Sequence, residues 1–71
     1  MKDQRQLEAD VLGYRIERVR TFDEHGETTA QWYEVLAPGD GALLGCFAQR
    51  SVAARAIVAR ELAQSPRSAA A

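Results

Sequence analysis

The stretch QWYEVLAPGDGALLGCF, residues 31–47, decides the fold, because two strand-like runs meet in it at a tight turn. The run Thr28–Leu36 contains threonine, valine and aromatic side chains, which favour strands. Ala37–Gly41 places Pro-Gly next to Asp-Gly, and both dipeptides are typical of turns. The run Ala42–Phe47 is apolar throughout, so a second strand is expected to return antiparallel to the first.

A strand on the N-terminal side of this hairpin is also predicted. In Tyr14–Phe22, apolar and polar residues alternate until the pattern slips by one position at Val19. A slip of this kind indicates a β-bulge, which we expect near Glu17–Val19. The polar segment Asp23–Glu27 contains a glycine and is typical of a hairpin loop. Short loops between three strands predict an antiparallel meander.

A C-terminal helix is expected over Ser51–Gln64. This segment contains neither glycine nor proline and is rich in alanine, the best helix former. Ser51 is a suitable N-cap, and Ser65-Pro66 ends the helix. The fold class is therefore predicted as α+β, a three-stranded antiparallel β-meander followed by a C-terminal helix packed on one face. In this interpretation residues 13–65 form a single β-β-β-α domain, and residues 66–71 form a mobile tail.

The first twelve residues leave two structures open. Leu7 and Val11 stand four positions apart behind Asp3, a suitable N-cap, so residues 1–12 fit a short amphipathic helix. An extended or mobile N-terminal segment fits the same polar composition. Gly13 ends the segment in either case.

Composition excludes several classes of protein. A chain of 71 residues that is 46% hydrophobic and 27% charged, with a formal net charge of -1, is typical of one small globular domain and not of a histone-like basic protein. It contains no apolar run of about 18 residues, the length needed to span a membrane. It opens without a charged-then-apolar leader, so a cytoplasmic location is expected. One cysteine allows no internal disulfide.

Catalytic and metal-binding patterns are weak. Asp23–Glu27 holds one histidine and three acidic residues, but it lacks the distal ligand of a calcium loop and is typical of a polar hairpin tip. Cys46 lies in an apolar run, where a buried structural thiol is expected. The glycines of Gly39–Gly45 precede a strand, whereas a phosphate-binding loop precedes a helix. We therefore expect no enzyme activity, no metal site and no cofactor.

Both faces of the predicted sheet are apolar. Along the last strand Leu43 and Phe47 point one way, and Leu44 and Cys46 point the other way. A single helix covers only one face, so the other face must be covered by residues 1–12, by a second copy or by a different protein. A small chain without a disulfide gains stability from oligomerisation, which favours a two-fold homodimer. The predicted partner-binding residues are Trp32, Tyr33, Leu44, Cys46 and Ile57.

The helix offers two orientations. Val58 and Leu62 lie in a wide apolar arc that we expect to face the sheet, with Leu62 buried. Arg55 intrudes in this arc, and Ile57 lies outside it. Either Arg55 extends to the edge of the interface, or Ile57 faces a partner. The predicted core contains Ile16, Val35, Phe47 and Leu62, together with Trp32 or Tyr33.

Charge is unevenly distributed along the chain. Residues 1–41 carry five basic and nine acidic residues, whereas residues 42–71 carry four arginines and a single acid, Glu61. Three explanations are open. The charges are solvated at the surface, or the basic residues form a patch that meets an acidic patch on a second copy, or this basic patch contacts phosphates. In the last case nucleic acid is the partner, bound by Arg18, Arg20, Arg50, Arg55 and Arg60.

A short pattern of residues resembles a known module. It consists of Trp32–Val35, Asp40–Gly41, Gly45–Phe47 and then Ala53 before Ile57. This pattern resembles the β-β-β-α arm-type DNA-binding domain of tyrosine recombinases, and equally several uncharacterised bacterial domains of the same plan. The resemblance spans residues 14–64 and implies the fold more than the function. The recombinase domain carries lysines and arginines in its turn and third strand, whereas residues 41–46 contain none.

These observations predict a non-catalytic protein-binding module. Eight arginines against one lysine, with many alanines, are typical of a GC-rich bacterial genome, so bacterial, phage or plasmid origin is expected. The module is expected to self-associate or to dock on a larger complex, and an inhibitor such as an anti-CRISPR protein is one specific form of this hypothesis. The alternative is a nucleic-acid-binding accessory domain of a mobile element.

Overall fold

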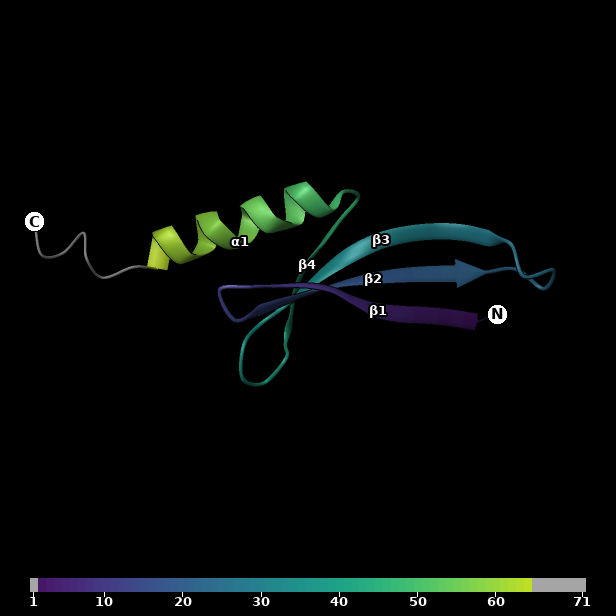
Figure 1. Cartoon of the computed structure of the whole chain (residues 1–71), viewed down its shortest axis with the longest axis horizontal. Coiled ribbons are helices and arrows are strands. Elements are labelled where there is room, and N and C mark those ends of the chain that lie inside the picture. The colour runs from purple at the N-terminus through teal and green to yellow at the C-terminus, as the bar shows by residue number, and fades with distance from the viewer. Residues whose placement is uncertain (1, 65–71) are drawn as a thin grey trace, which may run out of the picture.

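Four strands form one antiparallel sheet, and a single helix lies across one end of it (Figure 1). The computed structural model describes residues 2–64, and the predicted tail at residues 66–71 lies outside them. The elements are β1 (Lys2–Val11), β2 (Tyr14–Phe22), β3 (Thr28–Leu36), β4 (Leu43–Phe47) and α1 (Arg50–Gln64). The α+β class, the three predicted strands and the C-terminal helix are confirmed, but the sheet has one strand more than predicted.

The additional strand is β1, in the segment for which the sequence leaves open a short helix and an extended or mobile N-terminus. It joins β2 through a two-residue turn in which Leu12 and Gly13 have φ values of 54° and 87°. Two successive positive φ values produce the mirror-image turn whose twist matches that of a hairpin. The register of β1 shifts between Leu7 and Ala9, so Leu7 and Val11 face opposite sides of the sheet. Their four-residue spacing therefore reflects a bulged strand and not a helix.

The prediction of a bulge at Glu17–Val19 of β2 is wrong, because the nearby bulge lies in the partner strand β1, between Leu7 and Ala9. Over residues 15–21, β2 pairs with β3 without a register shift. Val19 breaks the alternation in β2 because it is buried on the other face of the sheet from Ile16. The slip in the sequence pattern therefore marks a change of the buried face along a regular strand.

The helix α1 packs on the sheet through Ala53 and Ile57, which are both buried. They form the core together with Tyr14, Ile16 and Val35. The Tyr14 hydroxyl donates a 2.7 Å hydrogen bond to Glu61, one turn beyond Ile57. This bond to the carboxylate raises the pKa of Tyr14. The line of residues 53, 57 and 61 therefore faces the sheet.

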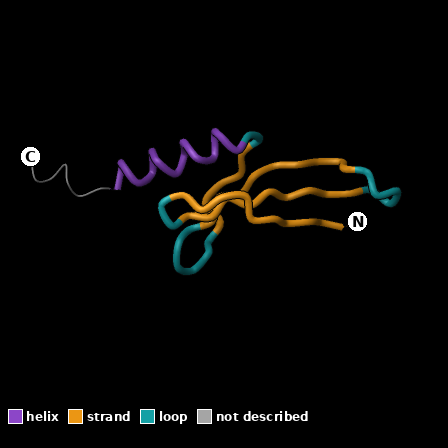
Figure 2. The backbone as a smooth tube through the Cα atoms, in the orientation of Figure 1, coloured by secondary structure: helices purple, strands orange, loops and turns teal. Residues whose placement is uncertain are grey.

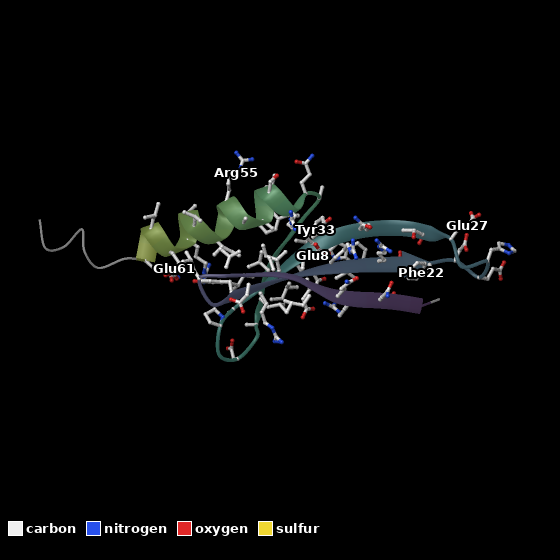
Figure 3. The ribbon with its side chains drawn as sticks, viewed as in Figure 1. Glu8, Phe22, Glu27, Tyr33, Arg55 and Glu61 are labelled. Atoms are coloured by element: carbon white, nitrogen blue, oxygen red, sulfur yellow. The ribbon has the colours of Figure 1, made fainter. Side chains whose placement is uncertain are left out.

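The orientation of α1 is opposite to the one expected from its apolar arc. Leu62 and Val58 are 56% and 43% exposed, whereas Ile57 is 1% exposed. Ile57 therefore belongs to the core of the chain and does not face a partner. Figure 3 shows Arg55 pointing away from the sheet. The small side chain of Ala53 allows a close approach on the buried side, and the bond to Glu61 fixes the rotation.

The rest of the predicted core is only partly confirmed. Ile16 and Val35 are buried as expected, and Trp32, Tyr33 and Phe47 are half-buried. A Cβ atom at Gly45 would lie 3.1 Å from the Phe47 ring, so glycine is what allows this ring to lie over the strand.

The molecule is elongated. Its principal extents are 57 × 22 × 15 Å and its radius of gyration is 14.8 Å, against roughly 11 Å for a compact domain of this length. Residues 2–6 of β1, 18–22 of β2 and 28–32 of β3 project beyond α1 as a three-stranded ribbon (Figures 1 and 2). The loop of residues 23–27 lies at the far end of the ribbon. The core cluster around Ile57 and α1 thus occupy one half of the molecule, and the ribbon, which contains the buried Val19, occupies the other.

Candidate protein-interaction surface

The sheet face turned away from α1, called the open face, has no helix packed on it within residues 2–64 (Figure 1). Strand register arranges its residues in three rows across the sheet. The rows are Arg5–Val19–Trp32, Leu7–Glu17–Glu34–Cys46 and Asp10–Arg15–Leu36–Leu43.

Glu34 lies at the centre of the open face. Its side chain is 9% exposed, and both of its carboxylate oxygens accept hydrogen bonds. Arg5 Nη1 donates to Oε1 at 2.6 Å, and Trp32 Nε1 donates to Oε2 at 2.9 Å. Arg5 Nη1 also donates to Glu17 Oε1 at 3.3 Å. These four residues form the Glu34 network, which ties together β1, β2 and β3 and fixes the indole of Trp32.

The Glu34 network favours the ionised form of Glu34. The hydrogen bond from Trp32, aided by the bond and charge of Arg5, lowers the pKa of Glu34 despite its burial. The bond to Glu34 in turn raises the pKa of Arg5. A general acid at neutral pH needs a raised carboxyl pKa. The network is therefore suited to stabilising a surface and not to transferring protons.

Apolar side chains surround the Glu34 network. Leu7 and Leu43 are each 56% exposed, and Cys46 is also exposed. Trp32 and Leu36 are half-buried between them. A partner that covers this centre would bury Arg5, Glu17 and Glu34 as a paired group with one excess negative charge, so each charged side chain keeps a partner. The open face thus combines exposed leucines with a paired polar centre.

The structure divides the predicted partner-binding residues between the two faces of the sheet. Trp32 and Cys46 lie on the open face. Tyr33 and Leu44 pack against the core on the helix side, where Ile57 is buried. Cys46 is exposed, so the expectation of a buried thiol is wrong. Its position directly opposite Glu34 in the register points it to the open face.

Sequence reasoning missed Arg5, Leu7 and Leu43 as members of this surface. Arg5 and Leu7 lie in β1, which contains few of the β-branched residues that indicate strands. Gly13 was the available signal for a strand in this segment. It separates residues 2–11 from residues 14–22, two runs of similar length, as the turn of a hairpin does. Leu43 joins Cys46 on the open face because the register of β4 shifts by one residue near Leu44.

Three arginines of the nucleic-acid hypothesis lie on the helix side of the sheet. Arg18 donates to Gln6 at 2.6 Å and pairs with Glu8 at 3.3 Å. Arg50, at the start of α1, pairs with the same carboxylate at 3.5 Å. Arg20 donates to a neighbouring glutamine at 3.0 Å. Glu8 therefore neutralises part of the positive charge in this region.

The other two arginines of that hypothesis are exposed on α1. Arg55 points away from the sheet (Figure 3), whereas Arg60 lines a groove beside β4. The five arginines are therefore not brought together on one continuous basic surface.

The loop between β2 and β3 is closed by its own hydrogen bonds. Asp23 Oδ1 accepts from the backbone amides of His25 and Glu27, each at 2.9 Å. Within the described residues, no group of three or more histidine, cysteine and acidic side chains is placed to hold a metal ion. In the same part of the chain no helix has the length and apolar character needed to cross a membrane.

No protein-family model matches this chain, and no similar protein is found among curated proteins or solved structures. Its function is therefore inferred from the geometry and chemistry of its own surfaces.

Proposed function

We propose that this chain is a non-catalytic protein-binding module that forms a two-fold dimer through its open face. The observation that carries this proposal is the combination of exposed leucines with a central charge network in which Arg5 pairs with both carboxylates. Leu7 lies at one side of the Glu34 network, and Leu43 and Cys46 lie at the other side. Exposed apolar side chains gathered on one face of a molecule are a feature of interaction sites.

A second copy fits the open face by symmetry. The Glu34 network pairs both of its carboxylates with Arg5 and keeps one net negative charge. A two-fold axis parallel to the strands would place β1 of each copy over β4 of the other, so that Leu7 meets Cys46 twice. A standard interface takes about 800 Å² from each partner. That area is about a sixth of the 5022 Å² that the chain exposes.

The mass of the protein in solution tests this proposal. Light scattering over a dilution series should give twice the mass of one chain at high micromolar concentration. The Leu7→Asp variant places a charge at the margin of the open face and should weaken dimerisation by about tenfold or more, equivalent to about 1.4 kcal/mol.

The matched control is Leu62→Asp, because Leu62 is also 56% exposed but lies on α1. This variant should remain a dimer. A wild-type chain that is monomeric throughout the series, or a dimer that is disrupted by Leu62→Asp and not by Leu7→Asp, would contradict the proposal.

Nucleic-acid binding by the ribbon is a second candidate function. Arg18 and Arg20 share the helix-side face of the ribbon with Gln6 and Gln31, which accept their hydrogen bonds. Arginine and glutamine are side chains that bind base edges in the major groove. The acidic tip at residues 23–27 opposes this function by repelling phosphates.

Salt dependence separates the two candidate functions. A nucleic-acid-binding ribbon would bind random duplex DNA and lose affinity steeply between about 50 and 200 mM salt. It would also lose affinity in the Arg18→Ala variant and not in Arg55→Ala. We expect no such binding, because the dimer function makes no use of the helix-side arginines.

A further inference from the structure

β4 forms an edge of the sheet that lacks the protection found at the other edge. The edge strand β1 carries Asp3, Arg5, Glu8 and Asp10 and contains a bulge, and both features hinder pairing with a further strand. The segment Ala42–Phe47 contains no charged residue and no proline. β4 pairs with β3 on one side only, and no described residue forms a backbone hydrogen bond with its outer side.

An apolar groove runs beside this edge on the helix side of the sheet. β4 contributes Leu44 and Phe47, α1 contributes Ala56 and Ile57, and Val35 of β3 lies between them. The groove is thus built from a sheet edge and an adjacent helix. This combination is the one used in β-augmentation, in which an added strand bonds to the edge and inserts alternate side chains into a neighbouring pocket.

Arg60 gives the groove a positive charge. It lines the groove as its one charged residue, and among residues 2–64 no carboxylate pairs with it within 4 Å. The nearest acid in sequence, Glu61, accepts the hydrogen bond of Tyr14. Arg60 also lies beside the Tyr14 hydroxyl, where its hydrogen bond and charge oppose the rise in the pKa of Tyr14 caused by Glu61. The guanidinium has five N–H donors, so it can also bond to an acidic group on an incoming strand.

We propose that the β4 edge and this groove bind an extended segment of another protein, which adds to the sheet as a fifth strand. Alternate residues of a strand face the same side. The bound segment therefore carries an apolar side chain for the groove and, two positions away, a carboxylate for Arg60. This site goes beyond the proposed dimer, because the dimer uses the opposite face of the sheet and leaves both the edge and the groove accessible.

A second copy of the chain suits this site less well than an acidic segment. Two copies paired through β4 would bring together two uncharged strands and would leave Arg60 without an acidic partner. Charge complementarity thus favours a segment that supplies a carboxylate.

Capped peptides provide the probe for this site. The first is a seven-residue threonine-rich peptide in which valine and aspartate stand two positions apart. The second carries lysine in place of aspartate, and the third is the first peptide with alternate backbone amides methylated. We expect calorimetry to show the acidic peptide binding at least about tenfold more tightly than either of the others, because only it offers both the charge and the backbone hydrogen bonds.

Two variants of α1 locate the binding. Arg60→Glu should lower the affinity for the acidic peptide by about tenfold or more and should raise the affinity for the lysine peptide. Arg55→Glu makes the same charge change on the outer side of the helix and should leave both affinities within about twofold. Melting curves of both variants establish that the fold is intact.

Several outcomes would overturn this inference. They are equal binding of the acidic and lysine peptides, unchanged binding in Arg60→Glu, full binding of the methylated peptide, or no binding of any peptide. If the Leu7→Asp variant still forms a dimer and the added peptide dissociates that dimer, a second copy occupies the β4 edge. Because Leu7 is remote from β4, the monomeric Leu7→Asp variant should bind the acidic peptide normally, and this separates failure of the edge site from failure of the dimer.

Discussion

Glu34 is the single residue on which the order of the open face depends. Its two oxygens hold Arg5 and the Trp32 indole from neighbouring strands, and little of its side chain reaches solvent. Burial disfavours the charged form of a carboxylate, whereas these two donors favour it. The donors prevail, since the pKa of Glu34 is lowered.

The lowered pKa of Glu34 predicts a stability change in acid. A carboxylate whose pKa is lower in the folded state stabilises that state above its unfolded pKa of about 4.5. This contribution is lost as the pH falls through the folded value. The free energy of unfolding of wild type should therefore exceed that of Glu34→Gln at pH 7, and the difference should shrink below about pH 4.

Urea unfolding between pH 7 and pH 2.5 measures this difference. Glu27→Gln removes one exposed loop carboxylate and controls for the change in net charge. A difference between wild type and Glu34→Gln that stays constant over the whole range would show that the network does not act through the charge of Glu34.

Leu12 is a second residue whose local environment predicts a measurable effect. Its φ of 54° is unusual for a residue with a Cβ, and its side chain is 63% exposed. Asparagine tolerates this conformation and is favoured before glycine in such turns. Leu12→Asn should raise the free energy of unfolding by about 1 kcal/mol, whereas Leu12→Ala retains the strain and should not. Equal urea midpoints for the two variants would contradict this explanation.

At the scale of elements, local signals were sufficient for β2, β3 and α1. β2 and β3 have the bounds that the sequence predicts, because their aromatic and β-branched residues end at clear turn residues. β1 has no such composition. It becomes a strand through its pairing with β2 across the Leu12-Gly13 turn, which is a contact that propensity does not contain. The same pairing places Arg5 and Leu7 on the open face, so half of the candidate site was beyond prediction.

The orientation of α1 was also beyond prediction from its own sequence. Its apolar residues are spread so widely around the helix that a helical-wheel projection does not identify a single buried face. The selection comes from elsewhere, through the bond from Tyr14 to Glu61 and the close packing of Ala53 and Ile57. An outward Leu62 follows from these contacts.

Truncation of two α1 residues tests this orientation. Ile57→Ala should lower the free energy of unfolding by about 2–4 kcal/mol, because it creates a cavity in the core. Leu62→Ala removes a side chain of the same size from an exposed position and should cost less than about 0.5 kcal/mol. A larger loss for Leu62→Ala than for Ile57→Ala would reverse the assignment of the buried side.

At the scale of the whole molecule, its length separates three surfaces. The open face, the β4 edge and the helix side of the ribbon point in different directions, so each is accessible while another is occupied. The elongated shape also leaves little core, with the cluster around Ile57 in one half of the chain and the buried Val19 in the ribbon. A small core of this kind gains stability when a second copy covers the open face.

A disulfide between copies tests the two-fold arrangement. Within one chain, positions 7 and 46 lie on the two outer strands of the sheet. Three strand spacings place them about 14 Å apart, too far for an internal disulfide. In the dimer they face each other, so mild oxidation of Leu7→Cys should link residue 7 of one copy to Cys46 of the other.

Peptide mapping by mass spectrometry identifies the linked residues. Leu62→Cys carries an equally exposed thiol on α1 and should form no link between positions 62 and 46 at a comparable rate. Links between positions 62 and 46 that form as fast as those between 7 and 46 would indicate random collision.

Trp32 is the one tryptophan of the chain, and its half-buried indole lies on the open face. Its fluorescence consequently reports on that face without any label. When a second copy covers the indole, water leaves its surroundings and the emission moves to shorter wavelength, and dilution moves it back. A peptide added at the β4 edge lies on the other side of the sheet and leaves the emission unchanged. A single intrinsic signal thus distinguishes the two binding events in one cuvette.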